Sequence, residues 1–212
     1  MRFLSLCVAA GEPAGINWLL AIWVMWSLMA VATMLPSAAP MIRTYCEIAD
    51  TAAAKGEPAV HPLVLVAGYL SVWAAASLLF AALTMLLAKA GSPPIARFAA
   101  PAALAIAGAY QFSALKEACL TKCRNPFAIL FSRWSDRVGR IYRLGMEQGL
   151  WCLGCCWALM LVMFAVGVMS IFWMALIGLF AVVEKQWEGP VPTRIAGAIL
   201  LVWAALLTVV SF

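Results

Sequence analysis

Long apolar segments separated by short polar connections dominate the sequence. Six of them approach or exceed the roughly 20 apolar residues that a membrane-spanning helix needs, and they cover residues 17–41, 62–88, 97–116, 146–166, 168–184 and 193–211. These runs lack the alternation of apolar and polar positions that is typical of a transmembrane β-barrel. The pattern predicts an all-α fold, in which residues 1–212 form a single integral membrane domain, a polytopic bundle of about six transmembrane helices.

A further helix of a different kind is expected between the third and fourth spans. Asn125 is a suitable N-cap and Pro126 a suitable first helical residue. Over residues 126–144, apolar side chains recur at helical spacing and arginines occupy the opposite face. This pattern predicts an amphipathic helix that lies in the cytoplasmic membrane interface. Such a connector would hold the end of the third span close to the start of the fourth.

Two interruptions of the apolar pattern affect the expected topology. Pro36 falls inside the first span and should bend or end that helix near Met34, with residues 42–61 as a polar connection. Residues 166–170 are a thin turn within the nearly continuous segment 146–184. A single helix of about 39 residues, at about 1.5 Å per residue, would far exceed a hydrocarbon core of about 30 Å. The segment is therefore expected to be a hairpin of two spans.

Composition supports the membrane assignment. The chain is 66% hydrophobic and only 11% charged, whereas roughly a quarter of the residues of soluble domains are charged. The first 15 residues have a short apolar core with no small-residue cleavage site, so a cleaved signal peptide is not expected. Cys7 in this segment is expected to lie at the membrane interface, and both Cys7 and Cys46 are expected to serve packing.

Basic residues indicate the orientation. With six spans, one side of the membrane carries eleven of the fourteen Lys and Arg residues, most of them between residues 116 and 143. The positive-inside rule makes that side cytoplasmic. The predicted location is therefore the bacterial inner (plasma) membrane, with both termini on the periplasmic side and the main basic loop in the cytoplasm. Because topology explains the net charge of +5, a nucleic-acid partner is not expected.

The candidate chemistry centres on a block of cysteines. Cys152, Cys155 and Cys156 have the spacing that places side chains on one face of a helix. Met160 and Met163 continue that face by one and two turns. Cys119 and Cys123 lie one helical turn apart, just upstream. The expected arrangement brings these five cysteines together at the cytoplasmic ends of their spans.

This arrangement predicts a soft-metal site. Thiolates and thioethers select Cu(I), and a four-thiolate set also suits Zn²⁺. Copper(I) is the favoured ion, because methionines accompany the cysteines, and zinc is the second candidate. Basic neighbours at Lys116, Lys122 and Arg124 would favour the thiolate form. The candidate ligands are Cys119, Cys123, Cys152, Cys155, Cys156, Met160, Met163 and, if the proline bend turns it inward, Met34.

Three classes of function remain open at this point. The protein binds copper and hands it to a membrane metalloenzyme or a copper chaperone; or it is an accessory subunit of a membrane complex or oligomer, with cysteines that pack; or it is a membrane thiol oxidoreductase. The two-residue spacing of Cys152 and Cys155 fits the third class, but no βαβ pattern surrounds it. Because no nucleotide loop, catalytic set or haem motif is present, an enzyme is the less favoured reading. The lipid bilayer is the first expected partner.

Several motifs together resemble a known group of sequences. They are Met25–Met29, Met34–Met41, Tyr110–Gln111, Leu115–Lys116, Cys119–Pro126, Gly145–Met146, Gly149, Cys152–Trp157 and Glu184–Lys185. This set resembles an uncharacterised bacterial family of predicted metal-binding integral membrane proteins, over about residues 20–190. The resemblance implies a multi-pass inner-membrane protein with a metal site, but neither a reaction nor a direction of transport.

Overall fold

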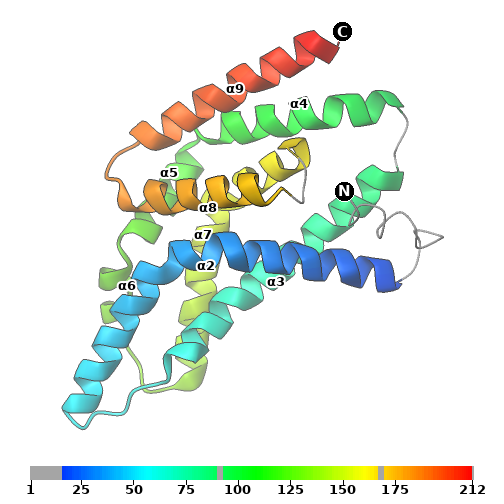
Figure 1. Ribbon diagram of the computed structural model, residues 1–212. Coiled ribbons are helices and arrows are strands. Elements are labelled where there is room, and N and C mark those ends of the chain that lie inside the picture. The colour runs from blue at the N-terminus through cyan, green and yellow to red at the C-terminus, as the bar shows by residue number, and fades with distance from the viewer. Residues whose placement is uncertain (1–15, 90–92, 167–169, 212) are drawn as a thin grey trace.

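The computed structural model describes residues 16–89, 93–166 and 170–211, and within these ranges all regular structure is helical. Figure 1 shows the arrangement of the helices. They are α2 (Ile16–Ala54), α3 (Pro62–Lys89), α4 (Pro93–Tyr110), α5 (Ala114–Arg124), α6 (Pro126–Ser132), α7 (Val138–Val166), α8 (Ile171–Gln186) and α9 (Val191–Ser211). The expected all-α fold is confirmed.

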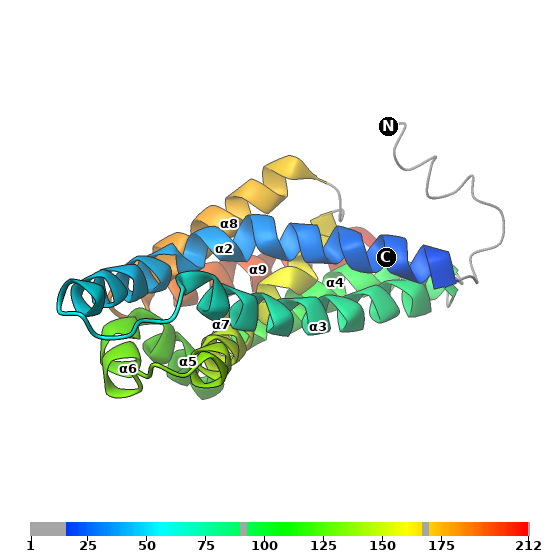
Figure 2. The same ribbon diagram turned by 90° about the horizontal axis from the view of Figure 1, so that it is seen from below.

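Close backbone contact between α3 and α7 forms the centre of the bundle. A side chain at Gly145 of α7 would place its Cβ 2.1 Å from the carbonyl oxygen of Leu65, and one at Gly68 of α3 would meet the carbonyl oxygen of Tyr142 at the same distance. Only glycine permits this approach, as is common where membrane helices pack. Helix α2 lies along α3 and α8, and α4 pairs with α9 (Figures 1 and 2). The cysteine block on α7 therefore lies inside the bundle.

The first helix is longer than expected. No polar connection begins at residue 42. Helix α2 continues to Ala54, so it has 39 residues in all and includes both Pro36 and Pro40. It changes direction part-way along, in the light-blue stretch of Figure 1, but does not end. Hydroxyl groups reinforce the proline-containing stretch, because the Ser37 side chain and the Tyr69 phenol both donate to the Met34 carbonyl, at 2.8 and 3.2 Å.

The third apolar segment is broken near its end. Helix α4 ends at Tyr110 and α5 begins at Ala114, with an angle of 66° between their axes. The side chain of Ser113 caps α5 by accepting a hydrogen bond from the backbone N–H of Lys116. The expected span over residues 97–116 therefore ends early, and Cys119 and Cys123 lie on a short, separate helix.

The expected amphipathic helix over residues 126–144 is two helical pieces. Helix α6 ends at Ser132, residues 133–137 are not helical, and residues from Val138 onward form the first turns of α7. The backbone N–H of Arg137 donates to the side chain of buried Ser135, which stabilises the turn between the pieces. Because α7 starts here, its cysteine block lies in the middle of a 29-residue helix.

Among the described residues, four helices are long and apolar enough to cross a membrane: α2, α3, α7 and α9. Counting the bent pair of α4 and α5 as one span would make five. Helix α8 has 16 described residues, fewer than the roughly 20 that a span needs. The expected turn at 166–170 lies largely in residues 167–169, outside the described part of the chain, as does Cys7.

Candidate metal centre

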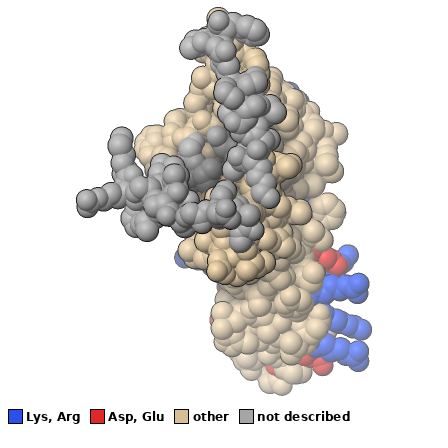
Figure 3. Space-filling model, turned by 90° about the vertical axis from the view of Figure 1, so that its right-hand side faces the viewer, with Lys and Arg blue, Asp and Glu red and all other residues tan. Residues whose placement is uncertain are grey.

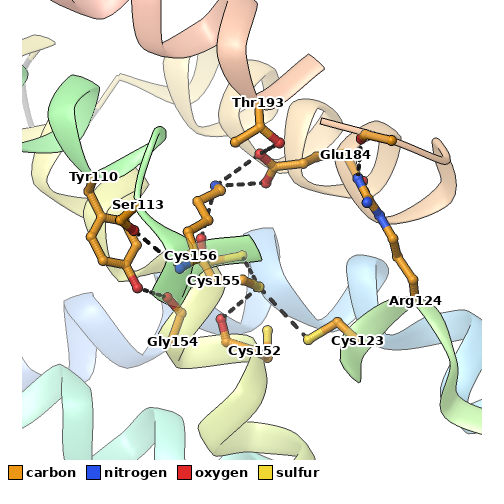
Figure 4. A network of polar contacts seen from close by, with 12 residues as sticks. Tyr110, Ser113, Cys123, Arg124, Cys152, Gly154, Cys155, Cys156, Glu184 and Thr193 are labelled. Atoms are coloured by element: carbon orange, nitrogen blue, oxygen red, sulfur yellow. Dashed lines mark hydrogen bonds and ion pairs between the residues drawn. The ribbon is translucent and has the colours of Figure 1, made fainter. Parts of the chain in front are cut away.

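Three buried thiols form the core of the site. The Sγ atoms of Cys152, Cys155 and Cys156 all lie within 4.8 Å of one another, and those of Cys155 and Cys156 are 3.2 Å apart. All three residues are at most 2% exposed. Figure 4 shows them together on the inner side of α7. The three sulfur atoms are close enough to bind one metal ion together.

A fourth thiol approaches from α5. The Sγ atom of Cys123 lies 3.8 Å from that of Cys155, and Figure 4 shows Cys123 pointing toward the α7 group. Two sulfur atoms that share one ion through bonds of about 2.3 Å, as for zinc, are at most about 4.6 Å apart. The measured separations of Cys155 from Cys156 and from Cys123 are both below this limit. Sulfurs from two helices thus lie at a distance at which one soft ion can bridge them.

Cys152 has polar partners that are not sulfur. Its Sγ lies 3.0 Å from the Tyr69 hydroxyl and 3.1 Å from Nζ of Lys185, which also donates to Ser37 Oγ at 2.7 Å. The Lys185 side chain is therefore held against this sulfur.

A buried ion pair lies next to the sulfur group. Nζ of Lys116 on α5 is 2.9 Å from the Glu184 carboxylate on α8, and both side chains are at most 1% exposed. Lys116 also donates to the Cys155 carbonyl at 3.0 Å, and Thr193 of α9 donates to Glu184 at 2.9 Å. Arg124 donates to the Glu184 backbone carbonyl (Figure 4). This network joins α5, α7, α8 and α9 around the cysteines.

A cavity of about 480 Å³ opens beside the sulfurs. Cys123 and Cys152 are in its wall, together with Tyr69 and Lys185, whereas Cys155 and Cys156 are not. The cavity therefore reaches two of the four clustered sulfurs and leaves the other two enclosed. We call it the sulfur cavity.

The remaining candidate ligands have different surroundings. Cys119 is buried on α5, where its Sγ takes the space that a side chain at Gly154 would need, since a Cβ there would be 2.6 Å away. Met160 and Met163 are buried further along α7. Met34 is fully buried, and its carbonyl is joined to Cys152 through the Tyr69 hydroxyl. A role for these residues as ligands stays a prediction.

The sequence matches one described family over most of its length. Residues 23–207 match the PpoB2 family, described as copper chaperone. The chain belongs to this copper chaperone family. No curated protein and no solved structure matches it. The family description agrees with the donor set, because buried thiols suit Cu(I) better than they suit oxygen-preferring cations.

Sequence reasoning missed several residues that contact the chaperone's sulfur group or its cavity. The cations expected near the thiols were on or near α5, yet Lys116 pairs with Glu184 and Lys122 is exposed. The lysine that contacts a sulfur is Lys185, and Tyr69 comes from an otherwise featureless apolar helix. One signal was present, because charged residues at the end of an apolar segment often mark a functional site.

Proposed function

We propose that this protein is a membrane copper chaperone that binds Cu(I) through Cys152, Cys155, Cys156 and Cys123 and delivers it to a membrane metalloenzyme. The observation that carries this proposal is the approach of four thiols from two helices, in a chain that belongs to a copper chaperone family. Thiolate ligands favour soft ions such as Cu(I) over the oxygen-preferring ions that a cell handles. Lys185 supplies a positive charge that offsets the negative charge of a Cu(I) thiolate complex.

The exposed surface supports a location in the membrane. Ile16, Leu20, Val24 and Leu28 form a stripe at every fourth residue of α2, and each is between 47% and 68% exposed. Soluble monomers rarely expose contiguous apolar surface of this kind. Lipid tails are the natural neighbours of such a stripe, so we infer that α2 faces the bilayer.

The distribution of charge supports the orientation. Lys and Arg side chains gather at the end of the molecule where α7 begins, and most of the remaining visible surface is uncharged (Figure 3). Arg137, Arg140 and Arg143 are exposed at this end. By the positive-inside rule this end faces the cytoplasm, and copper would reach the sulfur group from that side.

The arrangement favours metal binding over plain packing of thiols. Cysteines that only fill space have no need of a lysine and a phenol directed at their sulfurs, yet Cys152 has both. A desolvated cation is costly unless it has a charged partner. A metal–thiolate complex is such a partner for Lys185.

Copper loading of the purified protein tests the proposal. The parent and a variant with Cys152, Cys155 and Cys156 changed to serine are incubated with Cu(I) under anaerobic conditions, desalted, and analysed for copper. We expect about one copper per chain in the parent and less than about a tenth of that in the variant. Cys46→Ser, which removes a thiol outside the cluster, is the control and should bind like the parent. Equal copper in the parent and the triple variant would refute the proposal.

A further inference from the structure

Donor groups surround the sulfur cavity on several sides. Two cationic side chains, Arg124 and Lys185, are in its wall, with Glu188 as the acidic residue there. Asn125, Thr121 and Gln148 contribute further polar groups. The net balance of the charged lining residues is positive. A cavity of this kind attracts an anion.

Gln148 is the most informative of these residues. It is 3% exposed, and its Nε2 group has no hydrogen-bond partner among the described residues. It lies one helical turn before Cys152 on α7, and both residues line the cavity. A buried amide donor without a partner is costly, so a ligand that accepts a hydrogen bond there would remove the cost.

The charge of Arg124 is also available to a ligand. Its guanidinium donates to the backbone carbonyls of Glu184, at 2.9 and 3.2 Å, and of Gly189, at 3.0 Å. These carbonyls carry no formal charge, and within the described ranges Arg124 forms no ion pair. The contacts hold the side chain in place at the edge of the cavity without neutralising it.

Together with the proposed function, on which this inference rests, these observations indicate the form in which copper arrives. We propose that the sulfur cavity receives Cu(I) as a complex with a low-molecular-weight thiol that carries a carboxylate. Cu(I) bound by two thiolates has a charge of −1, and carboxylates make the complex more negative. A volume of about 480 Å³ lies within the range of pockets that take small molecules. Arg124 and Gln148 hold the carboxylate while the metal faces Cys123 and Cys152.

The transfer is a ligand exchange without oxidation or reduction. The incoming [Cu(SR)₂]⁻ meets two protein thiols, each of which replaces one thiolate of the carrier. Two Cu–S bonds break and two form, and the protons of the protein thiols leave on the released carrier thiols. The products are a protein-bound bis-thiolate copper complex of charge −1 and two molecules of RSH. Cys155 and Cys156, which do not line the cavity, then take the ion inward.

The experiment compares carriers of similar size and different charge. The rate of copper transfer to the purified full chain is measured from Cu(I) complexes of 3-mercaptopropionate, 2-mercaptoethanol and cysteamine, which are anionic, neutral and cationic in their second group. We expect transfer to be fastest from mercaptopropionate and slowest from cysteamine. In Gln148→Leu, the rate from mercaptopropionate should fall about tenfold, the effect of one hydrogen bond to a charged group. The rate from cysteamine should be unchanged.

A pair of α5 variants provides the matched control. Arg124→Gln and Lys122→Gln remove the same charge two residues apart, but only Arg124 lines the cavity. The first should slow transfer from mercaptopropionate and the second should not, with thermal unfolding confirming that both variants fold. Copper affinity at equilibrium, measured against a competing chelator, separates the two proposals. If the chain binds no copper, the proposed function fails; if it binds copper but accepts it equally fast from all three carriers, only the present inference fails.

Discussion

Two neighbouring regions of the bundle differ in how completely their buried polar groups are paired. Around Glu184, the carboxylate has both Lys116 and Thr193 as partners. One residue further along α8, Lys185 contacts the sulfur group, which adjoins a cavity. The amide nitrogen of Gln148 in that cavity has no partner in the described part of the chain. The difference indicates that the first region holds the helices together, whereas the second is suited to bind a ligand.

The largest effect on folding should come from the ion pair. Glu184→Gln would leave the fully buried Lys116 without a counter-charge, and we expect a loss of about 3–5 kcal/mol of stability. The measurement is unfolding of the detergent-solubilised protein. Glu188→Gln, at an exposed position on the same connection, is the control and should unfold like the parent.

A double variant sharpens this result. Replacing the pair with apolar residues, as in Lys116→Met with Glu184→Leu, removes both charges together. Buried pairs exchanged in this way are often neutral or stabilising, so the double variant should unfold closer to the parent than Glu184→Gln does. A double variant that is less stable than the single one would show that the network does more than balance charge.

The next effect separates a cysteine of the sulfur group from one outside it. Cys155→Ser removes the sulfur that contacts both Cys156 and Cys123. We expect the Cu(I) affinity to fall by about a hundredfold, because a soft ion binds a hydroxyl oxygen much more weakly than a sulfur. Cys119→Ser should change the affinity less than about threefold, since Cys119 packs against Gly154. Competition with a Cu(I) chelator measures both. Equal losses in the two variants would place Cys119 among the ligands.

A smaller effect is expected at the lysine that contacts the sulfur. Lys185→Gln keeps a hydrogen-bond donor near Cys152 and Ser37 but removes the positive charge. Groups that support metal ligands in this way typically contribute 10- to 100-fold in affinity, so a loss of about tenfold is expected. Lys122→Gln, the same change on the exposed face of α5, is the control. If copper binds Lys185→Gln as tightly as the parent, the lysine serves packing and not the metal.

The local pattern predicted several features correctly and missed where helices continue. Helical periodicity placed Cys152, Cys155 and Cys156 on one face, and they do meet. The pattern did not show that α2 runs through Pro36 and Pro40 to Ala54, because whether a proline bends or ends a helix depends also on how neighbouring elements satisfy the backbone groups that it frees. Here the Tyr69 hydroxyl of α3 donates to the Met34 carbonyl, and this contact joins residues that are distant in sequence.

What the sequence by itself determined is the class of the molecule and its chemistry: helices, long apolar segments and a thiol-rich stretch suited to a soft ion. These follow from composition and from periodicity within a single helix. Only the tertiary structure decided which cation meets the sulfurs, that Cys123 joins the group while Cys119 packs against Gly154, and that a cavity reaches Cys152. Each of these depends on the packing of helices that are distant in sequence, and a spacing rule within one helix carries no information about the helix beside it.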